Sequence, residues 1–260
     1  MSSGGNAPSV AVVTGGSDGI GLGAATALGL DGWEVVIASR RPETGRQAEQ
    51  TLTDRGVAAT WVEADMADPE AIDRLSAAAA ARGDLRAWVN NAGMAMIKDS
   101  LDVSVDEWDS IQAVNVRGVF LGACAAANAM REHGRGGVVV NVGSVAGQIG
   151  MPGRAAYCAS KHAVEGITKV LAIEWGPHGI RVVGVAPGYI MTDMVRRGQR
   201  NAGFDLGEIT RRVPLGRLGE PSEIGGVVAQ ICRPEAAYLT GETVRVDGGF
   251  VAHGGFEDLS

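Results

Sequence analysis

The 260-residue sequence is poor in the residues that mark several special protein classes. Its three cysteines form no CxxC pair and leave one residue unpaired, which is typical of reduced thiols and not of a disulfide scaffold. Its four histidines are scattered without metal-ligand spacing, so we expect no metal site. The 23 Lys and Arg are outnumbered by 30 Asp and Glu, giving a net charge of −7. This balance argues against a nucleic-acid-binding protein, because phosphate backbones require a basic face.

Long hydrophobic runs and a targeting signal are also missing. The N-terminal MSSGGNAPS has neither the basic region nor the apolar core of a signal peptide. The longest uncharged central run, Gly136 to Gly153, is interrupted by polar residues and by Pro152, so it is a poor membrane span. We therefore expect a cytoplasmic protein with no membrane partner.

The sequence does have the alternation that is typical of α/β proteins. Its 45% hydrophobic content is sufficient for a large core. Short, nearly continuous apolar segments alternate with helix-length segments, as parallel strands buried on both faces require. The predicted strands are Val10–Val13, Glu34–Ala38, Ala58–Val62, Leu85–Val89, Gly137–Val142, Arg181–Val185 and Glu242–Val246. We expect one α/β domain over residues 1–260, doubly wound, with a seven-stranded parallel sheet flanked by helices.

Local signals predict where several helices begin. Asp68 followed by Pro69 is a cap and a first-turn proline. Ser104 and Glu107 have the spacing of a capping box. A further helix is expected after Gly153, continuing to about Trp175.

A glycine-rich turn, Thr14 to Gly21, lies between the first strand and the first predicted helix. Glycines allow positive φ and a close approach of phosphate to the backbone, and the helix N-terminus attracts an anion. By itself the turn is equally compatible with an ordinary tight connection. Its place after the first strand favours phosphate binding at the carboxyl edge of the sheet.

The pattern Thr14-Gly15-x-x-x-Gly19-Ile20-Gly21 resembles the fingerprint of the classical short-chain dehydrogenase/reductase family, and in particular its 3-oxoacyl-carrier-protein reductases. The resemblance extends along nearly the whole chain. Its further motifs are Asp65, Asn90-Asn91-Ala92-Gly93, Asn115, Ser144, Tyr157-x-x-x-Lys161, Pro187-Gly188 and Val246-Asp247-Gly248-Gly249. It implies a Rossmann fold, a nicotinamide cofactor, a small carbonyl or alcohol substrate, and a homotetramer or dimer.

The same resemblance assigns cofactor contacts. Asp65, beside Met66, would hold the adenine edge, and the backbone of Asn91, Ala92 and Gly93 would border the adenosine ribose. Taken alone, Asp65 is equally a helix cap, and the Asn-Asn and Pro-Gly pairs are turn formers. The full predicted cofactor set is Gly15, Ser17, Asp18, Gly19, Ile20, Gly21, Ser39, Arg40, Asp65, Met66, Asn91, Ala92, Gly93, Tyr157, Lys161, Pro187, Gly188, Ile190 and Thr192.

The end of the second predicted strand bears on the choice between NADP and NAD. An acidic residue there binds the free 2′-hydroxyl of NAD, whereas a 2′-phosphate favours arginine. Here the residues at the end of this strand are Ser39-Arg40-Arg41, without an acidic side chain. We therefore expect a preference for NADP(H), with Ser39 donating a hydrogen bond and Arg40 pairing with the phosphate. NAD(H) stays possible, because Asp18 stands where related NADP enzymes often carry a basic residue. The alternative is that both arginines are simply solvated.

Tyr157 and Lys161 are four residues apart and therefore share one face of their helix. A neighbouring ammonium favours the phenolate, so this spacing predicts a lowered pKa for Tyr157 and proton exchange near neutral pH. Ser144 is positioned to bind the substrate oxygen. The resemblance adds that Lys161 bonds the nicotinamide ribose and that Asn115 anchors a proton-relay water. In isolation, such a Tyr-Lys pair is usually a surface pair.

These residues predict an NADP(H)-dependent oxidoreductase that interconverts a carbonyl and a secondary alcohol, with Tyr157 as general acid and base. The alternative is a catalytically idle dinucleotide-binding sensor or scaffold on the same fold. A serine hydrolase is disfavoured, because the segment around Ser144 lacks a nucleophile elbow.

The substrate is less defined. Methionines in the loops expected to border it suggest an apolar, cyclic or acyl compound. They are Met94, Met96, Met151, Met191 and Met194. A substrate loop is expected at about residues 190–217, and its arginines would either attract an anionic carrier or form a solvated helix face.

Overall fold

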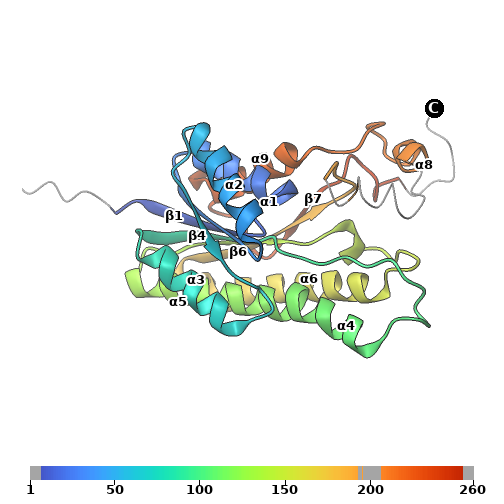
Figure 1. Cartoon of the computed structure of the whole chain (residues 1–260), viewed down its shortest axis with the longest axis horizontal. Helices are drawn as coiled ribbons and strands as arrows, with labels where there is room; N and C mark the ends of the chain where they lie inside the picture. The colour runs from blue at the N-terminus through green and yellow to red at the C-terminus, as the bar shows by residue number, and fades with distance from the viewer. Residues whose placement is uncertain (1–6, 193–194, 196–205, 254–260) are drawn as a thin grey trace, which may run out of the picture.

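A seven-stranded parallel sheet forms the centre of the computed structural model, which describes residues 7–192, 195 and 206–253 (Figure 1). The strand order is β3-β2-β1-β4-β5-β6-β7. The bounds are β1 (Ser9–Thr14), β2 (Glu34–Ser39), β3 (Ala59–Glu63), β4 (Asp84–Asn90), β5 (Gly137–Val142), β6 (Ile180–Pro187) and β7 (Thr243–Val246). The doubly wound parallel sheet expected from the sequence is confirmed. The order reverses between β1 and β4, which opens a crevice at the carboxyl ends of these two strands.

Helices cover both faces of this sheet (Figure 1). One layer contains α1 (Gly19–Leu30), α2 (Pro42–Asp54) and α9 (Pro221–Cys232). The other contains α3 (Pro69–Ala80), α4 (Val105–Gln112), α5 (Val119–His133) and α6 (Ala155–Trp175). The described chain also has α8 (Leu206–Arg211), a π-helical segment η1 (Ala113–Gly118), and the short 3₁₀ segments η2 (Val145–Gly147), η3 (Gly176–His178) and η4 (Pro234–Ala236). Each face has its own hydrophobic cluster, which explains why the strands are apolar on both sides.

The predicted helix starts are confirmed by their hydrogen bonds. The Asp68 side chain accepts from the backbone N–H of Glu70 at 3.0 Å. Ser104 Oγ accepts from the N–H of Glu107 at 3.2 Å, and Glu107 Oε2 accepts from the N–H of Ser104 at 2.9 Å, which completes the capping box. The helix that carries Tyr157 begins at Ala155 and ends at Trp175, as predicted.

The continuous helical stretch from α4 through η1 to α5, Val105–His133, is by length and composition apolar enough to cross a membrane, and its most apolar 18-residue window has a mean hydropathy of 1.2. The sequence analysis did not single out this stretch. Half of its most apolar window is buried inside the fold. It therefore has the character of a core helix that packs on the sheet.

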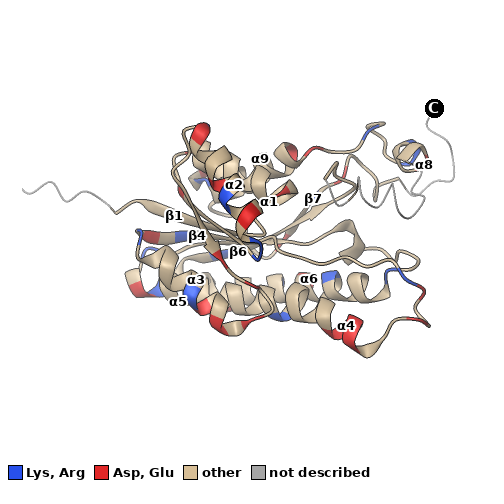
Figure 2. Ribbon diagram, viewed as in Figure 1, with Lys and Arg blue, Asp and Glu red and all other residues tan. Residues whose placement is uncertain are grey.

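Acidic and basic residues are interspersed along the outer helices in the ribbon view (Figure 2). The expectation, drawn from the net charge, that the protein does not bind nucleic acid stays a prediction.

The contact between α1 and α9 yields a prediction with a built-in control. A Cβ at Gly225 would overlap the backbone of Gly23, whereas one at the next residue, Gly226, would meet nothing within 4 Å. We expect Gly225→Ala to destabilise the protein by about 1–3 kcal/mol through overpacking. Gly226→Ala should instead stabilise it by about 0.5–1 kcal/mol, because alanine is the better helix former. Denaturant unfolding of both variants checks the opposite signs, and equal effects would contradict this account of the helix contact.

Candidate active site

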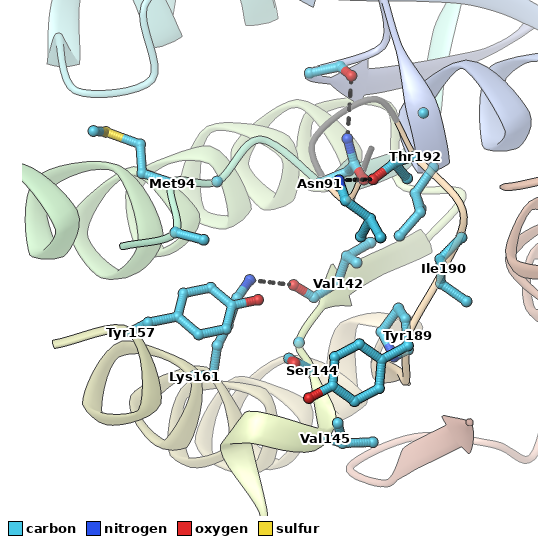
Figure 3. A pocket seen from close by; sticks show the side chains of 18 of the residues that line it. Asn91, Met94, Val142, Ser144, Val145, Tyr157, Lys161, Tyr189, Ile190 and Thr192 are labelled. Atoms are coloured by element: carbon cyan, nitrogen blue, oxygen red, sulfur yellow. Dashed lines mark hydrogen bonds between the residues drawn. The ribbon is translucent and has the colours of Figure 1, made fainter. Parts of the chain in front are cut away.

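A cleft of about 470 Å³ opens at the carboxyl ends of the central strands (Figure 3). Its walls come from the loops after β1, β4, β5 and β6 and from the start of α6. The structure brings together in it, from the predicted set, Gly15, Asp18, Gly19, Ile20, Asn91, Ala92, Gly93, Ser144, Tyr157, Lys161, Pro187, Gly188, Ile190 and Thr192. Residues from distant parts of the sequence thus converge where ligands of such sheets bind.

Other predicted residues lie outside the lining of this cleft, namely Ser17, Gly21, Ser39, Arg40, Asp65, Met66 and Asn115. Arg40 and Asp65 follow the adjacent strands β2 and β3, and their charged groups are 3.9 Å apart. The Ser39 hydroxyl oxygen accepts from the Trp61 indole N–H at 3.0 Å, so its hydrogen stays available to donate. Met66 is buried in the core cluster on the α3 and α5 side of the sheet.

The glycine-rich turn is held in shape by Asn91. The Asn91 side-chain amide donates to the carbonyls of Thr14 at 2.9 Å and Gly15 at 3.2 Å. In return, the Thr14 hydroxyl accepts from the backbone N–H groups of Asn91 and Ala92, each at 3.0 Å. These bonds attach the turn after β1 to the end of β4, so the glycine-rich turn and the Asn-Asn segment are positioned together.

The geometry of this turn fits a dinucleotide. Gly15 and Gly19 have positive φ values of 64° and 50°, which L side chains rarely adopt. The first-turn N–H groups of α1 lack intrahelical partners and lie at its positive end, as phosphate binding requires. Asp18 caps this end, and its carboxylate accepts from the N–H of Gly19 at 2.6 Å. That negative charge beside the predicted phosphate site opposes any preference for the more anionic cofactor.

Tyr157 and Lys161 lie on the same face of α6, as predicted. The Lys161 ammonium is 5.7 Å from the centroid of the Tyr157 ring and donates to the Val142 carbonyl at 2.9 Å (Figure 3). Lys161 is buried, and the loss of hydration lowers its pKa to about 8. The ammonium is therefore held at the floor of the cleft by the end of β5.

The predicted lowering of the Tyr157 pKa is wrong for the ligand-free chain. Burial raises the pKa of this phenol, and the side chains of Ser144 and Arg154 oppose the rise only in part. The Lys161 ammonium, which was expected to lower this pKa, donates its hydrogen bond to the Val142 carbonyl. Sequence spacing placed the pair correctly but contained no information about how deeply the phenol is buried.

Ser144 and Asn115 have different kinds of contact. Ser144 lines the cleft and caps η2, its Oγ accepting from the N–H of Ala146 at 3.1 Å. The Asn115 side chain is fully buried and donates to the Met94 carbonyl at 2.8 Å and the Ser160 hydroxyl at 3.0 Å. It also accepts from the Met94 N–H at 2.8 Å. Asn115 thus ties the loop after β4 to α6, and a role in holding water stays a prediction.

Several lining residues were not assigned to the site from the sequence. Arg41 lines the cleft although Arg40 was the predicted phosphate partner. Arg154 and Tyr189 line it too, and their nearness to the Tyr157 and Pro187-Gly188 motifs was the available signal.

The methionine hypothesis holds in part. Met94 and Met151 line the cleft, whereas Met96 does not, and Met191 lines a neighbouring pocket. Met194 lies outside the described residues.

The lowered pKa of Lys161 predicts a pH dependence of stability. Unfolding returns this group to a pKa near 10.5, so between about pH 8 and this value the unfolded chain binds more protons than the native one. The contribution of Lys161 to stability therefore rises with pH in this window. We expect ligand-free Lys161→Met to gain melting temperature relative to the wild type near neutral pH, and this gain to shrink as the pH approaches about 10. A difference that stays constant with pH in thermal scans would contradict the assignment.

Comparisons with known proteins agree with this geometry. Residues 15–251 match the family model described as enoyl-(acyl carrier protein) reductase. The chain is 36% identical over 249 residues to a 3beta-hydroxysteroid dehydrogenase 1 of Eggerthella lenta, with 95% of each chain covered. It is 36% identical over 245 residues to a 3-oxoacyl-[acyl-carrier-protein] reductase of Synechocystis sp., covering 93% of this chain and 96% of the relative.

Solved structures with a closely similar fold belong to the same group of reductases and dehydrogenases. A variant of an actinorhodin polyketide ketoreductase, crystallised with NADPH, has a TM-score of 0.89 and 35% identity, covering 94% of this chain and 97% of that one. The sheet order, the cleft motifs and these matches together show that the chain belongs to the classical short-chain dehydrogenase/reductase family and is an NAD(P)-dependent oxidoreductase acting between carbonyl and alcohol groups.

Proposed function

We propose that this protein is an NADP(H)-dependent reductase of a small-molecule ketone, or a dehydrogenase of the corresponding secondary alcohol, with Tyr157 as general acid and base. The observation that carries the proposal is the placement of Tyr157, Lys161 and Ser144 around one cleft that begins at the glycine-rich turn. When bound, the nicotinamide supplies or accepts the hydride.

The side chains of the cleft have separate roles in proton transfer, charge stabilisation and cofactor binding. Tyr157 Oη gives a proton to the substrate oxygen during reduction and removes it during oxidation. The Ser144 hydroxyl donates a hydrogen bond to the same oxygen and stabilises the negative charge that develops on it. The Lys161 ammonium, fixed by the Val142 carbonyl, provides positive charge beneath the phenol ring. The glycine-rich turn and the N-terminus of α1 hold the pyrophosphate.

The preference for NADP(H) rests on the ends of β2 and β3. Arg40 is exposed, and its pair with Asp65 at 3.9 Å is too open to be a strong ion pair, so Arg40 is available to a 2′-phosphate. Arg41 adds a second cation in the cleft lining, and the Ser39 hydroxyl retains a hydrogen to donate. Asp18 acts in the opposite direction, so use of NAD(H) is compatible with the site.

Arg40→Ala tests this preference. Removing a charge-assisted contact to phosphate should raise the KM for NADPH roughly tenfold, with little loss of stability because the side chain is exposed. NADH, which lacks the 2′-phosphate, serves as the matched control and should keep its KM. Steady-state kinetics with both cofactors check the result, and an unchanged KM for NADPH would exclude Arg40 as the phosphate partner.

The activity itself is tested by mixing the purified protein with NADPH and a panel of ketones, quinones and oxoacyl thioesters, and following the nicotinamide absorbance. Turnover of at least one carbonyl supports the proposal. NADPH binding without turnover of any carbonyl favours the alternative, an idle dinucleotide sensor or scaffold. The presence of Tyr157, Lys161 and Ser144 in one cleft favours the enzyme.

We also propose an oligomeric state, a cellular location and a domain organisation. Exposed apolar side chains on α4, α5 and α6, such as Val105, Phe120 and Ile173, support a homotetramer or dimer, which light scattering can test. The cysteines Cys124, Cys158 and Cys232 are free thiols, in agreement with a cytoplasmic location. Residues 1–260 would act as one domain. The substrate loop at about 190–217 falls partly outside the described residues.

A further inference from the structure

Tyr189, in the loop after β6, lines the cleft and faces it across from Tyr157, with Ser144 between them in the view (Figure 3). Tyr189 packs with a small hydrophobic cluster of Val145, Val213 and Phe250 that is separate from the two main cores. Val145 follows Ser144 directly in the chain and also lines the cleft. The cluster therefore supports both Tyr189 and the loop that carries Ser144.

The orientation of the Tyr189 ring is fixed from behind. Its centroid is 5.3 Å from that of Phe250, and the two rings meet edge to face at 80°. Phe250 is only 6% exposed, and the Arg212 guanidinium lies 5.2 Å from its ring centroid. Aromatic pairs of this kind prefer one geometry, so Phe250 restricts the rotation of Tyr189 without lining the cleft itself.

A tight turn places Phe250 at this position. The Asp247 carboxylate accepts from the N–H groups of Gly249 and Val251, each at 2.9 Å. Gly248 and Gly249 have positive φ values of 64° and 91°, and a Cβ on them would lie 2.7 Å from Val213 and 2.9 Å from Pro214. The turn after β7 is thus packed so closely that residue 250 has little freedom to move.

The same turn is locked to the loop that carries Tyr189. A Cβ at Gly188 would lie 2.8 Å from the Cα of Asp247, and the Gly188 N–H donates to the Val246 carbonyl at 3.0 Å. The backbone contacts between these two segments therefore fix the position of the Tyr189 ring relative to the Phe250 ring. Close packing and hydrogen bonds therefore hold this part of the cleft through both its side chains and its main chain.

We propose that Tyr189 determines the shape of the substrate, selecting ketones and alcohols whose reacting carbon belongs to a flat apolar ring system, and that Phe250 is a positioning residue acting through Tyr189. This inference rests on the proposed carbonyl reduction. A fixed aromatic face packs well against a flat ring, and such a ring loses less rotational freedom on binding than a flexible acyl chain does. Met94, Ile97 and Met151 line the same cleft and extend its apolar surface.

The experiment compares kcat/KM for tetralone, a flat bicyclic ketone, with that for butanone, using NADPH. The wild type should prefer tetralone. Tyr189→Leu should lower the tetralone-to-butanone ratio roughly tenfold, mainly through the KM for tetralone. Tyr189→Phe keeps the ring and should keep the ratio, which separates the aromatic face from the hydroxyl.

Phe250→Leu removes the edge-to-face partner and should lower the same ratio about threefold, whereas Phe250→Tyr keeps a ring and should restore it. Because Phe250 acts through Tyr189, the variant carrying both leucines should match Tyr189→Leu alone. A residue that only maintained the fold would instead lower kcat/KM for both ketones equally. Thermal unfolding monitors each variant, and Phe250→Met serves as a second ring-free variant should the leucine variant fail to fold.

The outcomes separate this inference from the proposed function. Turnover by the wild type with a ratio that Tyr189→Leu does not change overturns the role of Tyr189 and leaves the reductase intact. Additive effects in the double variant overturn the positioning role of Phe250. Binding of NADPH without turnover of either ketone or of any carbonyl in the panel overturns the reductase, and this inference with it.

Discussion

Tyr157→Phe should reduce carbonyl turnover by roughly 10²–10⁴-fold while the protein still folds and binds its nicotinamide cofactor. The change removes one oxygen atom from a side chain on the face of α6 that lines the cleft, and it leaves the ring, its packing and the ammonium of Lys161 in place. Since burial raises the pKa of this phenol, the neutral hydroxyl predominates near neutral pH and is ready to donate a proton in the reduction direction. The loss should therefore appear in kcat.

Stopped-flow or steady-state nicotinamide absorbance measures this loss, and fluorescence titration with NADPH measures the retained binding. Tyr238→Phe is the matched control, because Tyr238 is fully exposed and does not line the cleft. Retention of more than about a tenth of the wild-type kcat in Tyr157→Phe would remove the phenol from the mechanism.

The second large effect is expected from Gly21→Ala, in the first turn of α1. A Cβ at this position would overlap the Gly15 carbonyl and lie 2.5 Å from the side-chain amide nitrogen of Asn91. Those two groups form one of the hydrogen bonds that shape the glycine-rich turn, so the added methyl group should distort the turn and, if the turn holds the pyrophosphate as proposed, weaken NADPH binding by about 100-fold. The protein should also lose about 1–3 kcal/mol of unfolding free energy.

Gly166→Ala provides the control for this variant. Gly166 is a helical glycine in α6, and a Cβ there would meet nothing within 4 Å. NADPH affinity by fluorescence titration should be unchanged in this variant. Equal affinity in Gly21→Ala and the wild type would show that the close approach of α1 to the turn does not shape the cofactor site.

The sequence was sufficient to predict the sheet because both faces of each strand are covered. Val10–Val13 is apolar along its whole length, and Gly137–Val142 is apolar except for Asn141. The helix caps at Asp68 and Ser104 mark where helices begin between the strands. The ends of the strands are less certain in a sequence because polar end residues such as Ser9 carry no such signal. Short-range patterns thus determined the architecture.

The site was predictable where chemistry depends on spacing along one element, as for Tyr157 and Lys161. It was not predictable where it depends on burial or on residues far apart in the chain. Nothing in the spacing reveals that the Lys161 ammonium turns to the Val142 carbonyl, or that the phenol is deep enough for its pKa to rise. In the same way, the partnership of Tyr189 with Phe250 emerges only once β6 and β7 lie side by side.

The π-helical segment η1 has a consequence for how the chain tolerates length changes. In a π-turn one extra residue is accommodated within the helix, and the flanking α-helical turns keep their phase. Deleting one residue of Ala113–Gly118 other than Asn115 would convert the π-turn to an ordinary α-turn and leave α4 and α5 close to their present phase. A deletion in the regular part of α5 would instead rotate its two flanks against each other by roughly 100° and turn part of its apolar side away from the sheet. A single-residue deletion in η1 should thus be less damaging than one in the middle of α5.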